Sequence, residues 1–200
     1  MEPFVKLTAV AVPIDQPNVD TDQIIPARYL GRSREQQVEG FFHDMRLDAN
    51  DRPREGVTLN NPAYKGARII VANHNFACGS SRENAVTTMV DNGYRAFVAP
   101  SFGDIFFNNC FQNGALPIRL PSERVARLRI ILHELPGATL AIDLASQTVV
   151  GPDGQTDKFD IDSFRKDMLL KGTDSIDFTL GYDKDIARFE DGQRRDMPWL

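Results

Sequence analysis

The sequence predicts an α/β fold built around a partly parallel sheet. Between residues 66 and 132, short β-prone apolar runs alternate with longer runs whose apolar side chains have helical spacing. The links between these runs are short, so successive strands are expected to be parallel and joined by right-handed crossovers. After Pro136 the pattern changes to short β-prone runs separated by turns, which is typical of a hairpin. The expected sheet therefore combines parallel and antiparallel strands.

The N-terminal part is expected to open with a strand. Residues 4–12 alternate enough to form one, and Pro13 is expected to end it. A polar, turn-prone stretch over 15–22 then leads into residues 23–30. Residues 43–66 are rich in Asp, Asn, Arg, Pro and Gly, which indicates a mobile loop rather than a linker between domains.

Three strand–helix units follow. Their expected strands and helices are, in chain order, 68–72, 81–92, 94–99, 102–110, 115–118 and 125–132. Each helix places its apolar residues on one face, and Gly93 and Gly114 are expected to stop the first two.

The C-terminal part is expected to hold a hairpin and further helix. The expected elements are strands at 139–144, 148–150 and 158–161, a turn at 151–154, and a helix over 163–170 that ends at Gly172. The acidic tail over 183–200 is expected to be helical for a few turns and then to fray.

Length and composition indicate one domain over residues 1–200. A chain of 200 residues with 42% hydrophobic and 26% charged side chains fits a single compact core. No apolar run approaches the roughly 18 residues of a membrane helix, and the N-terminus lacks a signal-peptide profile. Cys78 and Cys110 form no CxxC pair, so neither a disulfide framework nor a metal site is expected in this chain. A cytoplasmic protein with no membrane partner is the expectation.

Charge is distributed unevenly along the chain. The first 142 residues carry 15 acidic and 15 basic side chains, so the net charge of −5 lies in the last 58 residues. Arginine outnumbers lysine 17 to 6, which is compatible either with anionic substrates or with a composition bias of the genome. No basic patch with interleaved aromatic residues is present, so a nucleic-acid partner is not expected.

The segment 73–85 is the strongest candidate for a binding site. It follows a buried strand and opens a helix, so its backbone N–H groups should meet an anion at the carboxyl edge of the sheet. Ser80, Ser81 and Arg82 could hold a carboxylate there. The spacing Ser80-x-x-Glu83 also fits a capping box, so capping and chemistry remain alternatives for Ser80.

Other motifs add weaker signals. Ser101-x-x-Asp104 repeats the capping pattern and is expected to cap a helix. The glycine spacing around Gly79 matches neither a nucleophile elbow nor a phosphate or dinucleotide loop, which disfavours triad hydrolases and P-loop enzymes. His43, His74 and His133 lack metal-ligand spacing and are expected at the surface or in packing.

A second candidate segment lies near the N-terminus. Asp22 belongs to an acidic, turn-prone stretch, and Arg28, Arg32 and Arg34 follow it. A carboxylate beside several guanidinium groups could orient a substrate, although turns use Asp routinely.

Three ordered segments together resemble a known family. Residues 19–30, residues 75–85 with Gly79-Ser80-Ser81-Arg82-Glu83, and residues 99–114 are similar to the small subunits of 3-isopropylmalate dehydratase, in the aconitase superfamily. The resemblance runs in order over nearly the whole chain. It implies an aconitase-type swivelling domain with a layered β/β/α fold, and a separate large subunit that holds a [4Fe-4S] cluster and supplies most of the remaining site.

The resemblance also implies roles for individual residues. Ser80 would be the base that removes a proton beside the departing hydroxyl, and Ser81 and Arg82 would bind a substrate carboxylate. Asp22 matches the acidic residue of the family's Thr-Asp motif, and either Arg32 or Arg34 would reach the dicarboxylate substrate. No metal is expected on this chain.

Two positions depart from the family pattern. Ala77 stands where the family usually has Gly, and Asn84 stands where it usually has His. The resemblance implies the hydro-lyase reaction that isomerises 2-isopropylmalate to 3-isopropylmalate in leucine biosynthesis, and the two departures keep other substrates open. The alternatives are a related hydro-lyase acting on citraconate or methylmalate, maleate or homoaconitate, and a non-catalytic homologue that binds a dicarboxylate.

Overall fold

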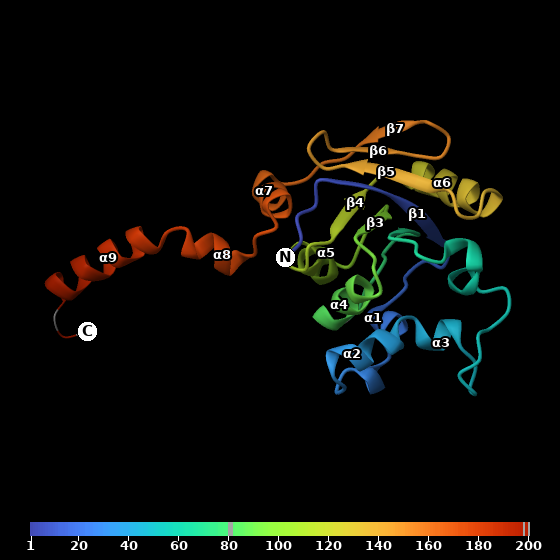
Figure 1. The fold of residues 1–200 in the computed structure, drawn as a ribbon, viewed down its shortest axis with the longest axis horizontal. Helices are drawn as coiled ribbons and strands as arrows, with labels where there is room; N and C mark the ends of the chain where they lie inside the picture. Colours follow the sequence, from blue (N-terminus) through green and yellow to red (C-terminus); the bar gives the residue numbers. More distant parts are fainter. Residues whose placement is uncertain (80–81, 198, 200) are drawn as a thin grey trace.

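A computed structural model describes residues 1–79, 82–197 and 199 of the chain. Its centre is a seven-stranded sheet in the order β4-β3-β2-β1-β5-β6-β7 (Figure 1). The strands are β1 Lys6–Ile14, β2 Ile69–Ala72, β3 Ala96–Ala99, β4 Leu116–Arg119, β5 Thr139–Asp143, β6 Thr148–Val150 and β7 Thr156–Lys158. Strands β1 to β4 are parallel, while β5, β6 and β7 add antiparallel neighbours beside β1. The predicted α/β fold with a partly parallel sheet is confirmed.

Pro13 lies inside β1 and does not end it, so that prediction was wrong. The carbonyl oxygens of Val10 and Ile14 accept hydrogen bonds from the β2 side, at 3.1 and 3.0 Å. The backbone nitrogen of Pro13 therefore points to the other edge of β1, the edge that faces β5. There, β5 pairs with β1 only as far as Val10. A missing N–H costs no sheet hydrogen bond at that place.

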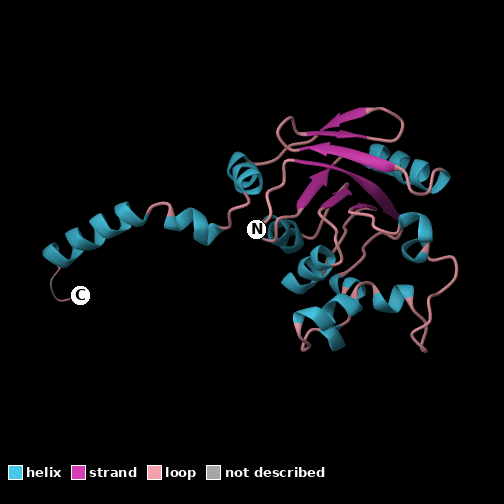
Figure 2. Cartoon of the chain, in the orientation of Figure 1, coloured by secondary structure: helices cyan, strands magenta, loops and turns pink. Residues whose placement is uncertain are grey.

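Helices cover both faces of the sheet (Figure 2). The helices, with short 3-10 turns marked η, are α1 Thr21–Ile24, η1 Ala27–Tyr29, α2 Arg34–Gln37, η2 Val38–Gly40, α3 His43–Arg46, η3 Thr58–Asn60, η4 Pro62–Tyr64, α4 Glu83–Asp91, α5 Asp104–Gln112, α6 Ser122–Glu134, α7 Ser163–Lys171, α8 Ser175–Leu180 and α9 Asp183–Asp196. The predicted end of α7 at Gly172 is confirmed, because that residue takes a left-handed φ of 68°. The last hairpin strand lies at Thr156–Lys158, slightly earlier than the predicted 158–161.

Two apolar cores form, one on each face of the sheet. Alternate strand residues such as Val12, Ile70 and Phe97 pack against α1, α4 and α5. The intervening residues, such as Ala11, Ile69 and Val98, pack against α6 and the inner side of β5 and β6. Strands buried on both faces explain why their sequences read as continuous apolar runs.

Two further segments adjoin this layered body, and Tyr64 of the first is buried in its core. Residues 43–66 contain short helices that Asn60 ties together, since its Nδ2 donates to the carbonyl oxygens of Arg46 and Arg54 at 2.7 and 3.0 Å. Helices α8 and α9 extend from α7 as an arm (Figure 1). Within the described ranges, no helix is both long and apolar enough to cross a membrane.

Candidate active site

Three loops meet where the parallel strands β1, β2 and β3 end. The loop after β1 pairs with the loop after β2 through a short parallel bridge between Asp20 and Cys78, and the loop after β2 pairs with the loop after β3 through Phe76 and Phe102. Ligand sites in open parallel sheets form at this edge. The loop that carries the predicted anion site is therefore held from both sides by backbone hydrogen bonds.

The loop over residues 75–79 has an unusual backbone. Asn75, Ala77 and Gly79 all take positive φ values, at 56°, 57° and 92°. Ala77 is also buried, at 3% exposure, and its carbonyl oxygen lies only 2.4 Å from where a Cβ on Gly103 would be. Left-handed φ is unfavourable for a residue with a side chain. The methyl group that sets Ala77 apart from the family's glycine is thus accommodated in a strained, tightly enclosed turn.

Two predicted site residues come together at the start of α4. Arg82 Nη1 donates to Asp22 Oδ1, across 60 positions of the sequence. Asp22 lies in the first turn of α1, which Asp20 caps by accepting a hydrogen bond from the Gln23 N–H at 2.8 Å. Neither side chain is buried, with 55% of Asp22 and 24% of Arg82 exposed, so the pair is accessible to a ligand. Ser80 and Ser81 lie outside the described residues.

The predicted cap at Ser101 was wrong, and the capping alternative for Ser80 falls on a residue outside the described ranges. Helix α4 begins at Glu83 with Arg82 as its N-cap, so Glu83 does not occupy the third helical position that a capping box requires. Its carboxylate instead accepts a hydrogen bond from Asn113 Nδ2 at 3.0 Å. Helix α5 has Gly103 as its N-cap, and the Ser101 hydroxyl accepts a hydrogen bond from the Asn75 N–H at 2.8 Å. Ser101 therefore fastens the loop after β2 rather than a helix end.

The remaining predicted arginines are distributed around Tyr29. The guanidinium of Arg32 lies over the Tyr29 ring, 4.3 Å from its centroid. Arg34 donates to both carboxylate oxygens of Asp91, at 2.7 and 2.9 Å, and these hydrogen bonds raise the pKa of Arg34. Because Asp91 is the last residue of α4, Arg34 is held at the opposite end of that helix from Arg82.

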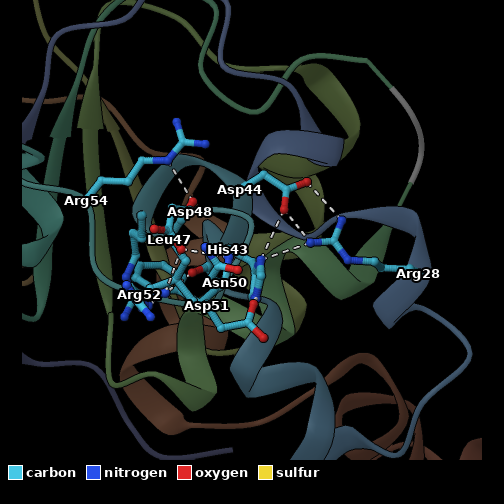
Figure 3. A network of polar contacts seen from close by, with 11 residues as sticks. Arg28, His43, Asp44, Leu47, Asp48, Asn50, Asp51, Arg52 and Arg54 are labelled. Atoms are coloured by element: carbon cyan, nitrogen blue, oxygen red, sulfur yellow. Dashed lines mark hydrogen bonds and ion pairs between the residues drawn. The ribbon is translucent and has the colours of Figure 1, made fainter.

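Arg28, on the N-terminal side of Tyr29, is held by a separate group of polar contacts (Figure 3). Its guanidinium donates to Asp44 and contacts His43 Nδ1 at 2.9 Å, and this pairing holds the pKa of Asp44 well below its usual range. His43 Nε2 lies 3.1 Å from Asp51 Oδ1, and its ring packs against Tyr29. His43 thus has a packing role, as predicted from its sequence context.

A cavity of about 340 Å³ adjoins the loop, lined by residues 75, 77–79 and 102–106. A larger cavity, about 540 Å³, lies between residues 53–62 and His133. We place the candidate site at the smaller one, because the loop that lines it also contacts Asp20 and leads into Arg82.

This chain does not fit as the holder of an iron–sulfur cluster. Such clusters are held by three or four cysteine thiolates, and the chain has two cysteines. Cys110 is fully buried in α5, and burial raises the pKa of its thiol. Throughout residues 1–79, 82–197 and 199, no group of three or more His, Cys, Asp or Glu side chains is placed to hold a metal ion.

Family models and curated relatives agree on the kind of protein. The aconitase C-terminal domain model matches residues 1–123, and a model described as LeuD_N matches residues 131–163. A 3-isopropylmalate dehydratase small subunit of Paramagnetospirillum magneticum is 45% identical over 201 residues, with both chains covered completely. The chain belongs to the family of 3-isopropylmalate dehydratase small subunits.

Further relatives support the same assignment. The 3-isopropylmalate dehydratase small subunits of Leptospira interrogans and Neisseria meningitidis serogroup B are 46% and 45% identical, over all of this chain and 98% and 99% of their own lengths. A crystal structure of 3-isopropylmalate dehydratase (leuD) from Methanocaldococcus jannaschii superposes with a TM-score of 0.65 at 26% identity, covering 92% of this chain and 99% of that one. The predicted aconitase-type fold is confirmed, and the small-subunit name of the relatives implies a large partner.

Sequence reasoning missed two residues of this 3-isopropylmalate dehydratase small-subunit fold. Gln37 is buried at 8% exposure and bonds both to α4 and to the segment after Tyr29, but no local pattern marks it. Gly103 allows the Ala77 carbonyl oxygen to approach closely. The only sequence signal for this contact is that Gly103 follows a predicted strand.

Proposed function

We propose that this chain is the small subunit of a heteromeric hydro-lyase that interconverts 2-isopropylmalate and 3-isopropylmalate in the leucine pathway of the cytoplasm. Removal of water gives 2-isopropylmaleate, and return of water places the hydroxyl on the neighbouring carbon. The full-length relatives support this substrate, since they are all named for isopropylmalate. Their names favour it over citraconate or methylmalate, maleate and homoaconitate.

The observation that carries the proposal is the contact between Asp22 and Arg82 beside the loop of residues 75–79. A guanidinium has five N–H donors in a planar fork, so Asp22 can engage one side of the fork while a substrate carboxylate takes the other. Asp22 then orients Arg82, and Arg82 binds the substrate. Of the two arginines that follow Tyr29, we propose that Arg32 binds the second carboxylate, because Arg34 is engaged by Asp91.

We propose Ser80 as the proton acceptor and Ser81 as a carboxylate ligand, on the strength of the family resemblance. The proton leaves the carbon next to the hydroxyl-bearing carbon and passes to the Ser80 oxygen, and the electron pair of that C–H bond forms the alkene as the bond from carbon to hydroxyl breaks. The departing hydroxide is taken up by the large subunit, where it is protonated and lost as water. A serine oxygen accepts a proton only where its alkoxide is stabilised. The start of α4 and the Arg82 guanidinium provide the positive potential that this requires.

The remaining parts of the site belong, in this proposal, to the large subunit. We propose that it carries the [4Fe-4S] cluster, since this chain lacks the thiolates to hold one. Residues 1–200 then act as one swivelling domain that closes over the cluster-bearing subunit and brings Arg82 to the substrate.

The residue assignments are tested with Ser80→Ala and Arg82→Lys in the reconstituted enzyme. Ser80→Ala should abolish turnover and leave association with the large subunit intact, as measured by size-exclusion chromatography. Arg82→Lys keeps the charge but loses the planar fork, so KM should rise. Full activity of Ser80→Ala would refute its role as the proton acceptor.

A further inference from the structure

The segment of residues 30–33 is fastened at both ends but spans an open stretch between them. Arg28 is held by Asp44 before the segment, and Arg34 is held by Asp91 after it. A Cβ on Gly31 would meet no described atom within 4 Å, whereas Leu30 packs against the core and the Arg32 N–H donates to the Tyr29 carbonyl oxygen at 3.1 Å. A further restraint acts on the carbonyl groups of this segment.

Gln37 supplies that restraint. Its Nε2 donates to the carbonyl oxygens of Leu30 and Arg32, at 3.2 and 3.0 Å. Its Oε1 accepts a hydrogen bond from Asn84 Nδ2 at 2.9 Å. Because both carbonyls can only accept, the amide nitrogen of Gln37 has to face them, and its oxygen has to face Asn84. Asn84 therefore has to be a hydrogen-bond donor.

Asn84 connects this restraint to the candidate active site. It lies in the first turn of α4, two residues after Arg82. The backbone at the start of α4 links Arg82 to Asn84, and hydrogen bonds then link Asn84 to Gln37 and Gln37 to the backbone of Arg32.

We propose that Asn84 and Gln37 form a positioning pair that fixes residues 30–33, and hence Arg32, relative to Arg82. The pair sets the spacing between the two guanidinium groups that would hold the two carboxylates of the substrate, so this inference rests on the proposed function. It also gives a physical role to the asparagine at position 84. An acidic side chain there would place a second acceptor against Gln37 Oε1 and break the series.

Asn84→Asp is the sharpest variant, because it keeps the size of the side chain and replaces the amide donor with a charged acceptor. Asn92→Asp is its matched control. Asn92 lies just after the same helix and donates to the carbonyl oxygen of Val38 at 3.1 Å, so the control makes the same chemical change against η2 but away from residues 30–33. Because Asn92→Asp places a negative charge at the C-terminal end of α4, its loss of thermal stability should be at least as large as that of Asn84→Asp.

The first measurement is the rate of tryptic cleavage after Arg32 in the full-length chain, followed by mass spectrometry. Cleavage of a folded chain reports the population of locally open conformations. Asn84→Asp should increase this rate by about tenfold, the effect of losing one part-buried hydrogen bond, and Gln37→Ala, which loses three, should increase it at least as much. Asn92→Asp should leave it within about twofold, and the double variant N84D/Q37A should cleave no faster than Gln37→Ala alone.

The second measurement is steady-state turnover of 2-isopropylmalate after reconstitution with the large subunit. Asn84→Asp should raise KM more than it lowers kcat, whereas Asn92→Asp should change neither. Cleavage no faster in Asn84→Asp than in Asn92→Asp would overturn the positioning pair, whatever the turnover. Faster cleavage with an unchanged KM would overturn the link from this segment to the substrate. Failure of the unsubstituted enzyme to use 2-isopropylmalate would instead overturn the proposed function, leaving the cleavage result to decide the pair.

Discussion

A methyl group on Gly103 should displace the loop of residues 75–79 and lower turnover. In the structure that Cβ would lie 2.4 Å from the Ala77 carbonyl oxygen and 3.1 Å from Cys78 Cα. Both neighbours are backbone atoms, so the contact is relieved only if one loop moves by about 1 Å to restore ordinary van der Waals separation. The Gly103 N–H also donates to the Phe76 carbonyl oxygen at 2.9 Å, and this hydrogen bond would lengthen as the loops part.

Two effects of Gly103→Ala can be estimated. Overpacking of this kind costs about 1–3 kcal/mol of unfolding free energy. A misplacement of about 1 Å at an active site lowers the rate by roughly 100-fold. The matched control is Gly192→Ala in α9, where a Cβ meets no described atom within 4 Å and the helix should gain up to about 1 kcal/mol.

The assay combines thermal unfolding of the chain with turnover of the reconstituted enzyme. The reasoning predicts a lower Tm and a large loss of turnover for Gly103→Ala, with neither loss for Gly192→Ala. Turnover of Gly103→Ala within about twofold of the unsubstituted enzyme, at an unchanged Tm, would refute the claim that this close approach positions the loop.

Three further predictions follow from other parts of the molecule. Asp22→Asn should raise KM by about tenfold. It should change the unfolding free energy by no more than about 1 kcal/mol, because the pair with Arg82 is exposed. An unchanged KM would show that Asp22 does not contribute to substrate binding. Burial raises the pKa of Tyr94 to about 12, so the unfolded chain ionises first and the unfolding free energy falls as pH rises from about 10 to 12, by about 3 kcal/mol in total. In denaturant titrations, Tyr94→Phe should lack this fall in unfolding free energy at alkaline pH. An equal fall in both proteins would contradict its assignment to Tyr94. Residues 43–66 should exchange amide hydrogens faster than β2 in the isolated chain, and protection equal to that of β2 would rule out their predicted mobility.

The sheet was predictable because its signal is local. Runs such as residues 69–72 and 96–99 are apolar throughout, and the alternation of strands and helices implies parallel pairing. Pro13 misled the prediction because its effect depends on which side of β1 has a partner, and that follows from the distant pairing with β5. The same is true of Ser101, whose hydroxyl bonds to the Asn75 N–H on another loop instead of to its own helix.

The candidate site was predictable only in part. The segments that contain Asp22 and Arg82 stood out, but their contact spans 60 positions and depends on the order of β1 and β2 in the sheet. Gln37 could not be found in this way, since its burial and its three hydrogen bonds arise from the packing of α2 against α4. Asn84 was noticed as a departure from the family pattern, and only the structure supplies its contact.

The most direct test of the account is turnover of 2-isopropylmalate by this chain combined, under anaerobic conditions, with the large subunit encoded in the same genome. Formation of the alkene 2-isopropylmaleate is followed by its ultraviolet absorbance, with each subunit alone as a control. The account predicts alkene formation only when both subunits are present, and its loss in Ser80→Ala. Absence of turnover of 2-isopropylmalate by an assembled, cluster-loaded complex that dehydrates another diacid would contradict it.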